Sequence, residues 1–119
     1  MRTTWIILAG MLAAPAAAQS YSESMAECAA IHQNAAQWVR SDDAVEKLLI
    51  ATRRWAEAAI MQAEVEGIAD PENVIWAMID RKTGEWEAKG PDVFTTEEFH
   101  DWVAYCRAFG QEFGIVLDA

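Results

Sequence analysis

The chain has few basic residues, and this shortage excludes several classes of partner. It contains 9 lysines and arginines against 19 aspartates and glutamates, which gives a formal net charge of −10 at pH 7. Such a negative field repels nucleic acid and anionic lipid, and it favours solubility or a basic partner. We therefore expect no nucleic-acid binding, and we expect any protein partner to be basic.

Motifs that carry catalysis or metal binding are also missing. The sequence has no Gly-x-Ser-x-Gly, no His-Glu-x-x-His and no Cys-x-x-Cys, which argues against hydrolase, zinc-protease and dithiol chemistry. The absence of Cys-x-x-Cys-His excludes covalent haem attachment, and the aspartate-rich segments lack the spacing of a calcium loop. We predict that the protein is not an enzyme, with no catalytic residues, no cofactor and no metal.

The one long apolar run lies at the N-terminus. It extends from Trp5 to Ala14, follows the basic Arg2, and leads into small residues that end at Ala18, before Gln19. This is the layout of a secretory signal peptide cleaved after Ala18. The run is shorter than the roughly 20 apolar residues that a membrane-spanning helix needs. We predict that residues 1–18 are removed on export to the periplasm.

Residues 19–119 are predicted to form one small domain. Loss of Arg2 leaves 9 − 1 = 8 basic residues against 19 acidic ones, a net charge of −11. No later segment is apolar enough to cross a bilayer, so no membrane contact is expected after cleavage. Cys28 and Cys106 are the 2 cysteines, and in an oxidising compartment they are expected to form a disulfide.

The periodicity of apolar residues predicts an all-α fold. Strand alternation and hairpin signals are absent, and four segments show helical spacing. These segments are Ser22–Val39, Asp42–Glu66, Asp70–Lys89 and Phe94–Leu117. Because the connections are short, we expect a small four-helix, up-down-type bundle. Its first and last helices would lie side by side, as the disulfide requires.

Two of the predicted helices carry capping signals at their starts. Ser24 with Glu27, and Thr95 with Glu98, have the spacing of a capping box, in which two side chains satisfy free amides. In the third predicted helix, Gly84 interrupts the run of helix-forming residues. Its apolar residues share one face only if it continues through this glycine, which we predict, and a break there is the alternative.

The two cysteines and two histidines suggest an alternative function in binding. Cys28 and His32 are four residues apart, a spacing that can present two ligands to one ion. His100, however, lies about 120° around its helix from Cys106, so the four groups do not converge. A haem bound between Met25 and His100 is a second form that such a binding site could take. We predict that His32 is a core or boundary residue with a hydrogen-bond partner, and we retain small-ligand, haem or metal binding within the bundle as the alternative.

Apolar residues outside the expected core indicate a possible partner-binding surface. Ile50, Met61 and Val65 lie away from the main apolar face of the second helix. Trp76 lies off the main face of the third. Apolar and aromatic anchors dominate protein interfaces, so we predict that these four residues form the surface. Ordinary packing of large side chains in the bundle is the competing interpretation.

Short motifs around the cysteines support an assignment to a class of proteins. The first helix contains Glu27-Cys28-Ala29-Ala30, and the last contains Tyr105-Cys106-Arg107-Ala108-Phe109-Gly110. With its alanine-rich signal peptide, the chain resembles the small uncharacterised exported helical proteins of Gram-negative bacteria. The resemblance implies a periplasmic address and a helical fold, and it supplies no activity. We predict a non-catalytic protein-interaction module, chaperone-like or immunity-like in its general plan.

Overall fold

The computed structural model describes residues 19–115, and every regular element within that range is helical. The elements are α2 (Tyr21–Ala36), α3 (Asp42–Val65), α4 (Pro71–Ala88), the 3-10 turn η2 (Pro91–Thr95) and α5 (Glu97–Phe113). The prediction of an all-α, four-helix bundle is confirmed. The predicted signal peptide lies outside the described residues, and no helix from residue 19 to 115 is long and apolar enough to span a membrane.

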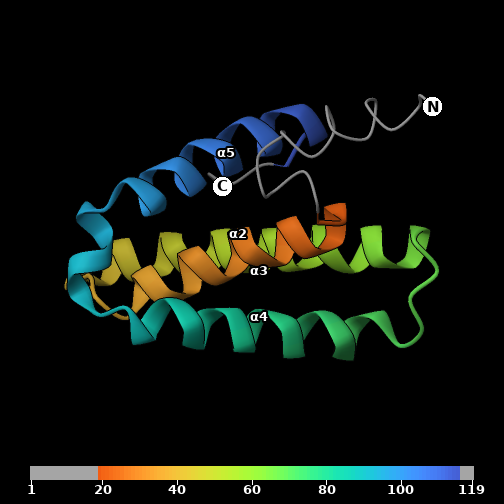
Figure 1. The fold of residues 1–119 in the computed structure, drawn as a ribbon, viewed down its shortest axis with the longest axis horizontal. Helices are drawn as coiled ribbons and strands as arrows, with labels where there is room; N and C mark the ends of the chain where they lie inside the picture. Colours follow the sequence, from red (N-terminus) through yellow and green to blue (C-terminus); the bar gives the residue numbers. More distant parts are fainter. Residues whose placement is uncertain (1–18, 116–119) are drawn as a thin grey trace, which may run out of the picture.

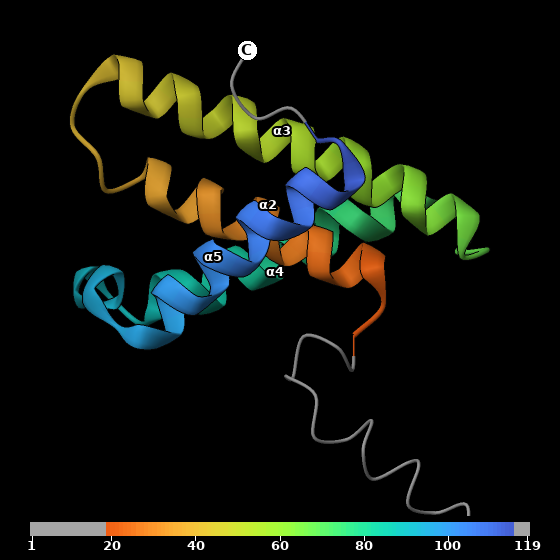
Figure 2. The same cartoon turned by 90° about the horizontal axis from the view of Figure 1, so that it is seen from above.

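Helix α2 is the centre of the bundle. It packs against α3 and α4, and consecutive helices run in opposite directions (Figure 1). Helix α5 forms a separate layer that crosses obliquely over α2 (Figure 2). The first and last helices are therefore neighbours, as predicted, and α5 crosses α2 rather than lying parallel to its axis.

Small residues line the packed faces of α2 and α3. Six alanines on these two helices are almost completely buried: Ala26, Ala29, Ala30, Ala56, Ala59 and Ala63. Short side chains at a helix contact let the two backbones approach closely. Larger side chains fill the remaining interior, and Trp55, Ile75 and Ile79 are fully buried. The core therefore combines close helix contacts with a few large apolar groups.

The predicted capping box at the start of α2 is wrong. The helix begins at Tyr21, and the hydroxyl of Ser20 caps it by accepting a hydrogen bond from the Glu23 amide. Ser24 and Glu27 are buried inside the helix instead. The matching spacing was therefore coincidental, because both side chains face the interior rather than the free amides of the first turn.

The capping box at the start of α5 was predicted one residue too early. Thr96 caps the helix, and its hydroxyl accepts from the Phe99 amide at 3.2 Å. Thr95 belongs to the preceding 3-10 turn, so the pairing of Thr95 with Glu98 is wrong. The expected apolar contact across this start is present, because the rings of Phe94 and Phe99 lie 5.1 Å apart.

Two glycines end helices by adopting the left-handed conformation. Gly67 follows α3 with φ 81°, and Gly114 follows α5 with φ 69°. In each case the amide of the next residue, Ile68 or Ile115, bonds to the carbonyl five residues back, which is the Schellman arrangement. Helix α5 therefore ends before the predicted Leu117, which itself lies outside the described range.

Helix α4 continues through Gly84, as predicted. The hydroxyl of Thr83 donates to the carbonyl of Ile79 at 2.7 Å, and Ile79 and Trp86 are both buried. The continuous helix keeps these apolar side chains on the face that packs against the bundle. The alternative of a break at this glycine is wrong.

Two helix-interior glycines predict opposite responses to alanine. A Cβ added at Gly84 meets no atom within 4 Å, whereas one added at Gly110 lies 3.3 Å from Cζ2 of Trp55. We expect Gly84→Ala to raise the free energy of unfolding by about 0.5–1 kcal/mol in urea denaturation, because alanine loses less backbone entropy. Gly110→Ala should lower it, because Trp55 is fully buried and cannot move aside. Equal gains from both substitutions would contradict this packing.

Candidate functional site

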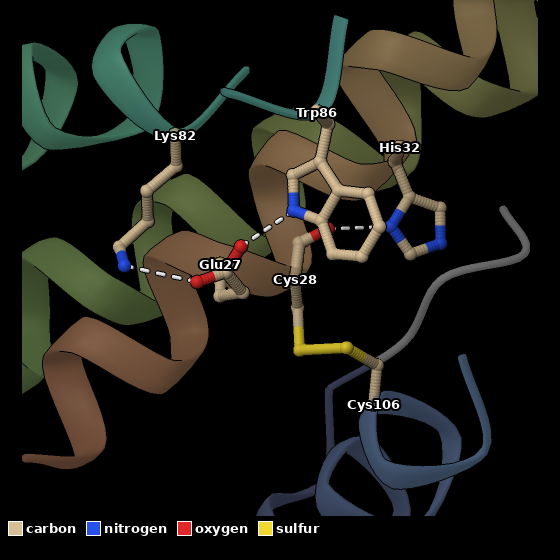
Figure 3. The surroundings of a disulfide bond; sticks show 6 residues. All are labelled: Glu27, Cys28, His32, Lys82, Trp86 and Cys106. Atoms are coloured by element: carbon tan, nitrogen blue, oxygen red, sulfur yellow. Dashed lines mark hydrogen bonds and ion pairs between the residues drawn. A yellow bond between two sulfur atoms is a disulfide. The ribbon is translucent and has the colours of Figure 1, made fainter. Parts of the chain in front are cut away.

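The disulfide links the central helix to the helix that covers it. Cys28 of α2 and Cys106 of α5 are bonded, with their Cα atoms 5.8 Å apart (Figure 3). Both residues are buried, and no free cysteine remains. The predicted pairing is confirmed. Because each sulfur is bonded to the other, neither can act as a thiolate ligand in this state.

Aromatic contacts hold α5 on either side of the disulfide. Phe109 lies between Tyr21 and Trp55, with ring centroids 5.7 and 5.9 Å away. At the other end of the helix, the ring of Phe99 lies 6.1 Å from that of Trp86. Only three residues of α5 are buried, against ten of α2. The disulfide therefore fastens a helix that has a small buried face.

His32 lies one turn beyond Cys28 and forms a hydrogen bond with it. Its Nδ1–H donates to the carbonyl oxygen of Cys28 at 2.7 Å (Figure 3). Burial lowers the pKa of the His32 imidazole below the ordinary value of 6.5, and the backbone hydrogen bond partly opposes this effect. The prediction of a boundary histidine with a hydrogen-bond partner is confirmed.

This histidine predicts a loss of stability in mild acid. The unfolded chain takes up a proton as the pH falls through 6.5, whereas His32 in the folded state takes it up only at lower pH. Its stabilising contribution is therefore complete above pH 6.5 and is lost below it. We expect His32→Gln to reduce the fall in unfolding free energy between about pH 7 and about pH 5, measured in urea. His100→Gln, at an exposed position, is the matched control, and an unchanged slope in His32→Gln would contradict the prediction.

The residues that would bind a metal ion or haem in the alternative function do not lie together. Met25 is buried in α2 and His100 is exposed on α5. Cys28 is committed to the disulfide. Within residues 19–115, no group of three or more histidine, cysteine, aspartate or glutamate side chains is placed to hold a metal ion.

A buried carboxylate joins α2 to α4, and the sequence patterns did not reveal it. One oxygen of Glu27 accepts from Nζ of Lys82 at 2.9 Å, and the other accepts from Nε1 of Trp86 at 2.6 Å (Figure 3). Lys82 is only 5% exposed and also lies 3.4 Å from a carboxylate oxygen of Glu23. Both oxygens of Glu27 are therefore engaged in fixing α4 against α2.

A second carboxylate fastens the start of α2 to the end of α3. Glu66 accepts from the hydroxyl of Ser22 at 2.6 Å and from its amide at 3.2 Å. Desolvation raises the pKa of Glu66, but the hydrogen bonds from Ser22 and Gln62 outweigh it, so this pKa is lowered overall. The negative charge also lies at the positive end of the α2 dipole. Glu66 thus acts as a cap supplied by another helix.

The four residues of the predicted partner-binding surface differ in their exposure to solvent. Met61 and Val65 are 67% and 80% exposed, one turn apart on α3. Ile50 is partly buried and lies about 16 Å along the axis from Met61. Trp76 is also partly buried, and it packs against the core. Met61 and Val65 are therefore the most exposed pair among the four.

Comparisons with protein-family models, with curated proteins and with solved structures found no match for this chain. Its function therefore has to be inferred from its own side chains. The disulfide and the contacts of Glu27 and Glu66 hold helices together. Met61 and Val65 are largely solvent-exposed, so they are the strongest candidates for a functional surface.

Proposed function

We propose that this chain is a non-catalytic, exported protein of the periplasm that acts by binding another protein. The observation that carries the proposal is the exposure of Met61 and Val65 side by side on α3. A single exposed apolar side chain is ordinary on a protein surface, whereas neighbouring large ones are typical of interaction sites. Val65 is the more exposed of the two, and burial against a partner would remove its side chain from water.

The proposed address rests on the N-terminal sequence and is supported by the disulfide. Disulfides form and persist in oxidising compartments, and the bond between Cys28 and Cys106 joins the central helix α2 to α5, which covers it. The negative charge of the chain favours solubility and discourages contact with anionic lipid. These properties agree with a protein that works free in the periplasm.

The proposed periplasmic location is tested by expressing the full chain and determining the N-terminal residue of the protein recovered from the periplasm. We expect sequencing to begin at Gln19. An uncleaved chain, or one that stays in the cytoplasm, would overturn the proposed address. Arg2→Glu, which removes the positive charge before the apolar run, is expected to reduce export.

Protein binding is tested by crosslinking in periplasmic extract. We expect one protein to be captured in stoichiometric amount, with no chromophore in the absorption spectrum and no metal by elemental analysis. A stoichiometric chromophore or metal ion in the purified protein would overturn the proposal and favour a ligand-binding role. Capture of no protein would overturn it as well.

A further inference from the structure

One segment of the bundle carries acidic residues and no basic ones. Residues 57–72 contain no lysine, arginine or histidine, and they contain five acids: Glu57, Glu64, Glu66, Asp70 and Glu72. This segment runs from the second half of α3 into the start of α4, so it forms one end of the molecule (Figure 1). The opposite end contains the start of α3 and the end of α4, where Lys47 and Lys89 lie among a larger number of acids. Basic residues are therefore present at that end and absent from residues 57–72.

The last turn of α3 places the negative charge of Glu64 where a helix disfavours it. The C-terminus of a helix carries the negative end of its dipole, which is stabilised by nearby cations. The last turn of α3 contains no basic residue, and it includes the exposed Glu64. The carboxylate of Glu66 is stabilised by its hydrogen bonds to Ser22. The carboxylate of Glu64, in contrast, is exposed to solvent. A cation beside the last turn of α3 would therefore be favoured.

The two most exposed large apolar side chains of the described range lie within this acidic segment. Met61 and Val65 are 67% and 80% exposed. Glu57 is exposed one turn before Met61, and Glu64 adjoins Val65. Because residues four apart share a face of a helix, apolar and acidic groups alternate along one strip of α3. Val74, at the start of α4, is 37% exposed at the same end.

We propose that this strip of α3 docks a basic amphipathic helix of a protein partner. The apolar side of the partner helix would cover Met61 and Val65, and lysines or arginines beside it would face Glu57 and Glu64. Helices commonly bind in this way, with anchors spaced by one turn. The inference rests on the proposed function and specifies the chemistry of the partner.

Charge complementarity selects this occupant over the others. An anionic membrane would be repelled by the same acids. A second copy of the chain docked on the same strip would bring Glu57 and Glu64 against their own counterparts, and like charges across an interface are costly. A basic helix satisfies the apolar and the electrostatic requirement together.

The test is a nuclear magnetic resonance titration of the 15N-labelled, disulfide-bonded protein. The probe is a synthetic peptide of about 18 residues, with leucine on one helical face and lysine on the other. We expect shifts concentrated between residues 57 and 74. The same peptide with glutamate in place of lysine, and vesicles of anionic lipid, should produce none. Shifts spread evenly over the surface would show charge attraction alone and would overturn the inference.

Variants separate the strip from the rest of the acidic surface. We expect the double substitution Met61→Ser with Val65→Ser to reduce the affinity for the leucine–lysine peptide by about tenfold or more. Leu49→Ser, at a position 38% exposed near the other end of α3, is the matched control and should leave affinity unchanged. Glu57→Gln with Glu64→Gln should make binding less sensitive to salt. Equal affinity of the double serine variant and the wild type would overturn the docking site.

Crosslinking in periplasmic extract distinguishes failure of this inference from failure of the proposed function. A protein captured equally by the wild type and the double serine variant would preserve the proposed function and overturn the docking surface. Capture of no protein would overturn the proposed function, and the inference that rests on it would fall as well. A wild-type dimer that the double variant dissociates would also overturn the inference, because a second copy would then cover the strip.

Discussion

Replacing both Cys28 and Cys106 with alanine is expected to lower the free energy of unfolding by about 4–5 kcal/mol. The bond joins residues separated by 78 positions, and the chain-entropy cost of closing so long a loop sets this magnitude. A small domain has about 5–15 kcal/mol of stability in total. The measurement is urea denaturation followed by circular dichroism. Free-thiol titration of the denatured, unreduced wild type should find no thiol.

The loss of stability is expected to be larger in α5 than in the other helices. Cys106, Phe109 and Gly110 are the only buried residues of α5, so the remaining contacts hold this helix weakly once the bond is gone. Hydrogen exchange in the double-alanine variant should therefore accelerate in α5 more than in α2. Reduction of the wild type should reproduce the change, and reductant should not affect the variant. Equal protection of α5 in the variant and the wild type would contradict this account.

Replacing Lys82 with methionine is expected to cost about 3–5 kcal/mol. The substitution removes the ammonium group that lies 2.9 Å from Glu27, and it leaves a buried carboxylate without its counter-charge. Trp86 would remain as the one hydrogen-bond donor to this carboxylate among the contacts described above. The measurement is the urea midpoint and slope at neutral pH. Arg81→Met is the matched control, because its ion pair with Glu85 is exposed and is worth under about 1 kcal/mol.

The double replacement Glu27→Met with Lys82→Met separates charge from packing. Removing both charges avoids the uncompensated carboxylate and leaves only the indole N–H of Trp86 unsatisfied, at a cost of about 1–3 kcal/mol. We therefore expect the double variant to be more stable than Lys82→Met alone. A double variant less stable than the single one would mean that the ion pair itself, rather than the stranded charge, dominates the energy.

Local sequence patterns were sufficient to predict the four helices, but they placed some helix boundaries wrongly. The 3.6-residue spacing of apolar groups indicated four helices, and the alignment across Gly84 correctly kept α4 whole. Capping boxes were less reliable, because Ser24 and Glu27 match the motif and yet face the interior. A motif of two residues cannot distinguish a free helix start from a buried turn when both positions are polar.

Sequence reasoning predicted the exposure of only some residues of the candidate surface. Met61 and Val65 were selected because they lie off the main apolar face of their helix, and both are exposed. Ile50 and Trp76 were selected on the same grounds and are partly buried. A helical wheel gives the direction of a side chain from the axis, but neighbouring helices decide whether that direction leads to water.

By itself, the sequence determined the helical class, the continuity of α4 through Gly84 and the disulfide. Each of these depends on spacing along the chain or, for the cysteines, on the absence of any other partner. Only the tertiary structure decided that Glu27 meets Lys82, residues separated by 55 positions. It also decided that the acids around Met61 form one end of the bundle. Such contacts depend on the rotation and order of packed helices, which no local pattern encodes.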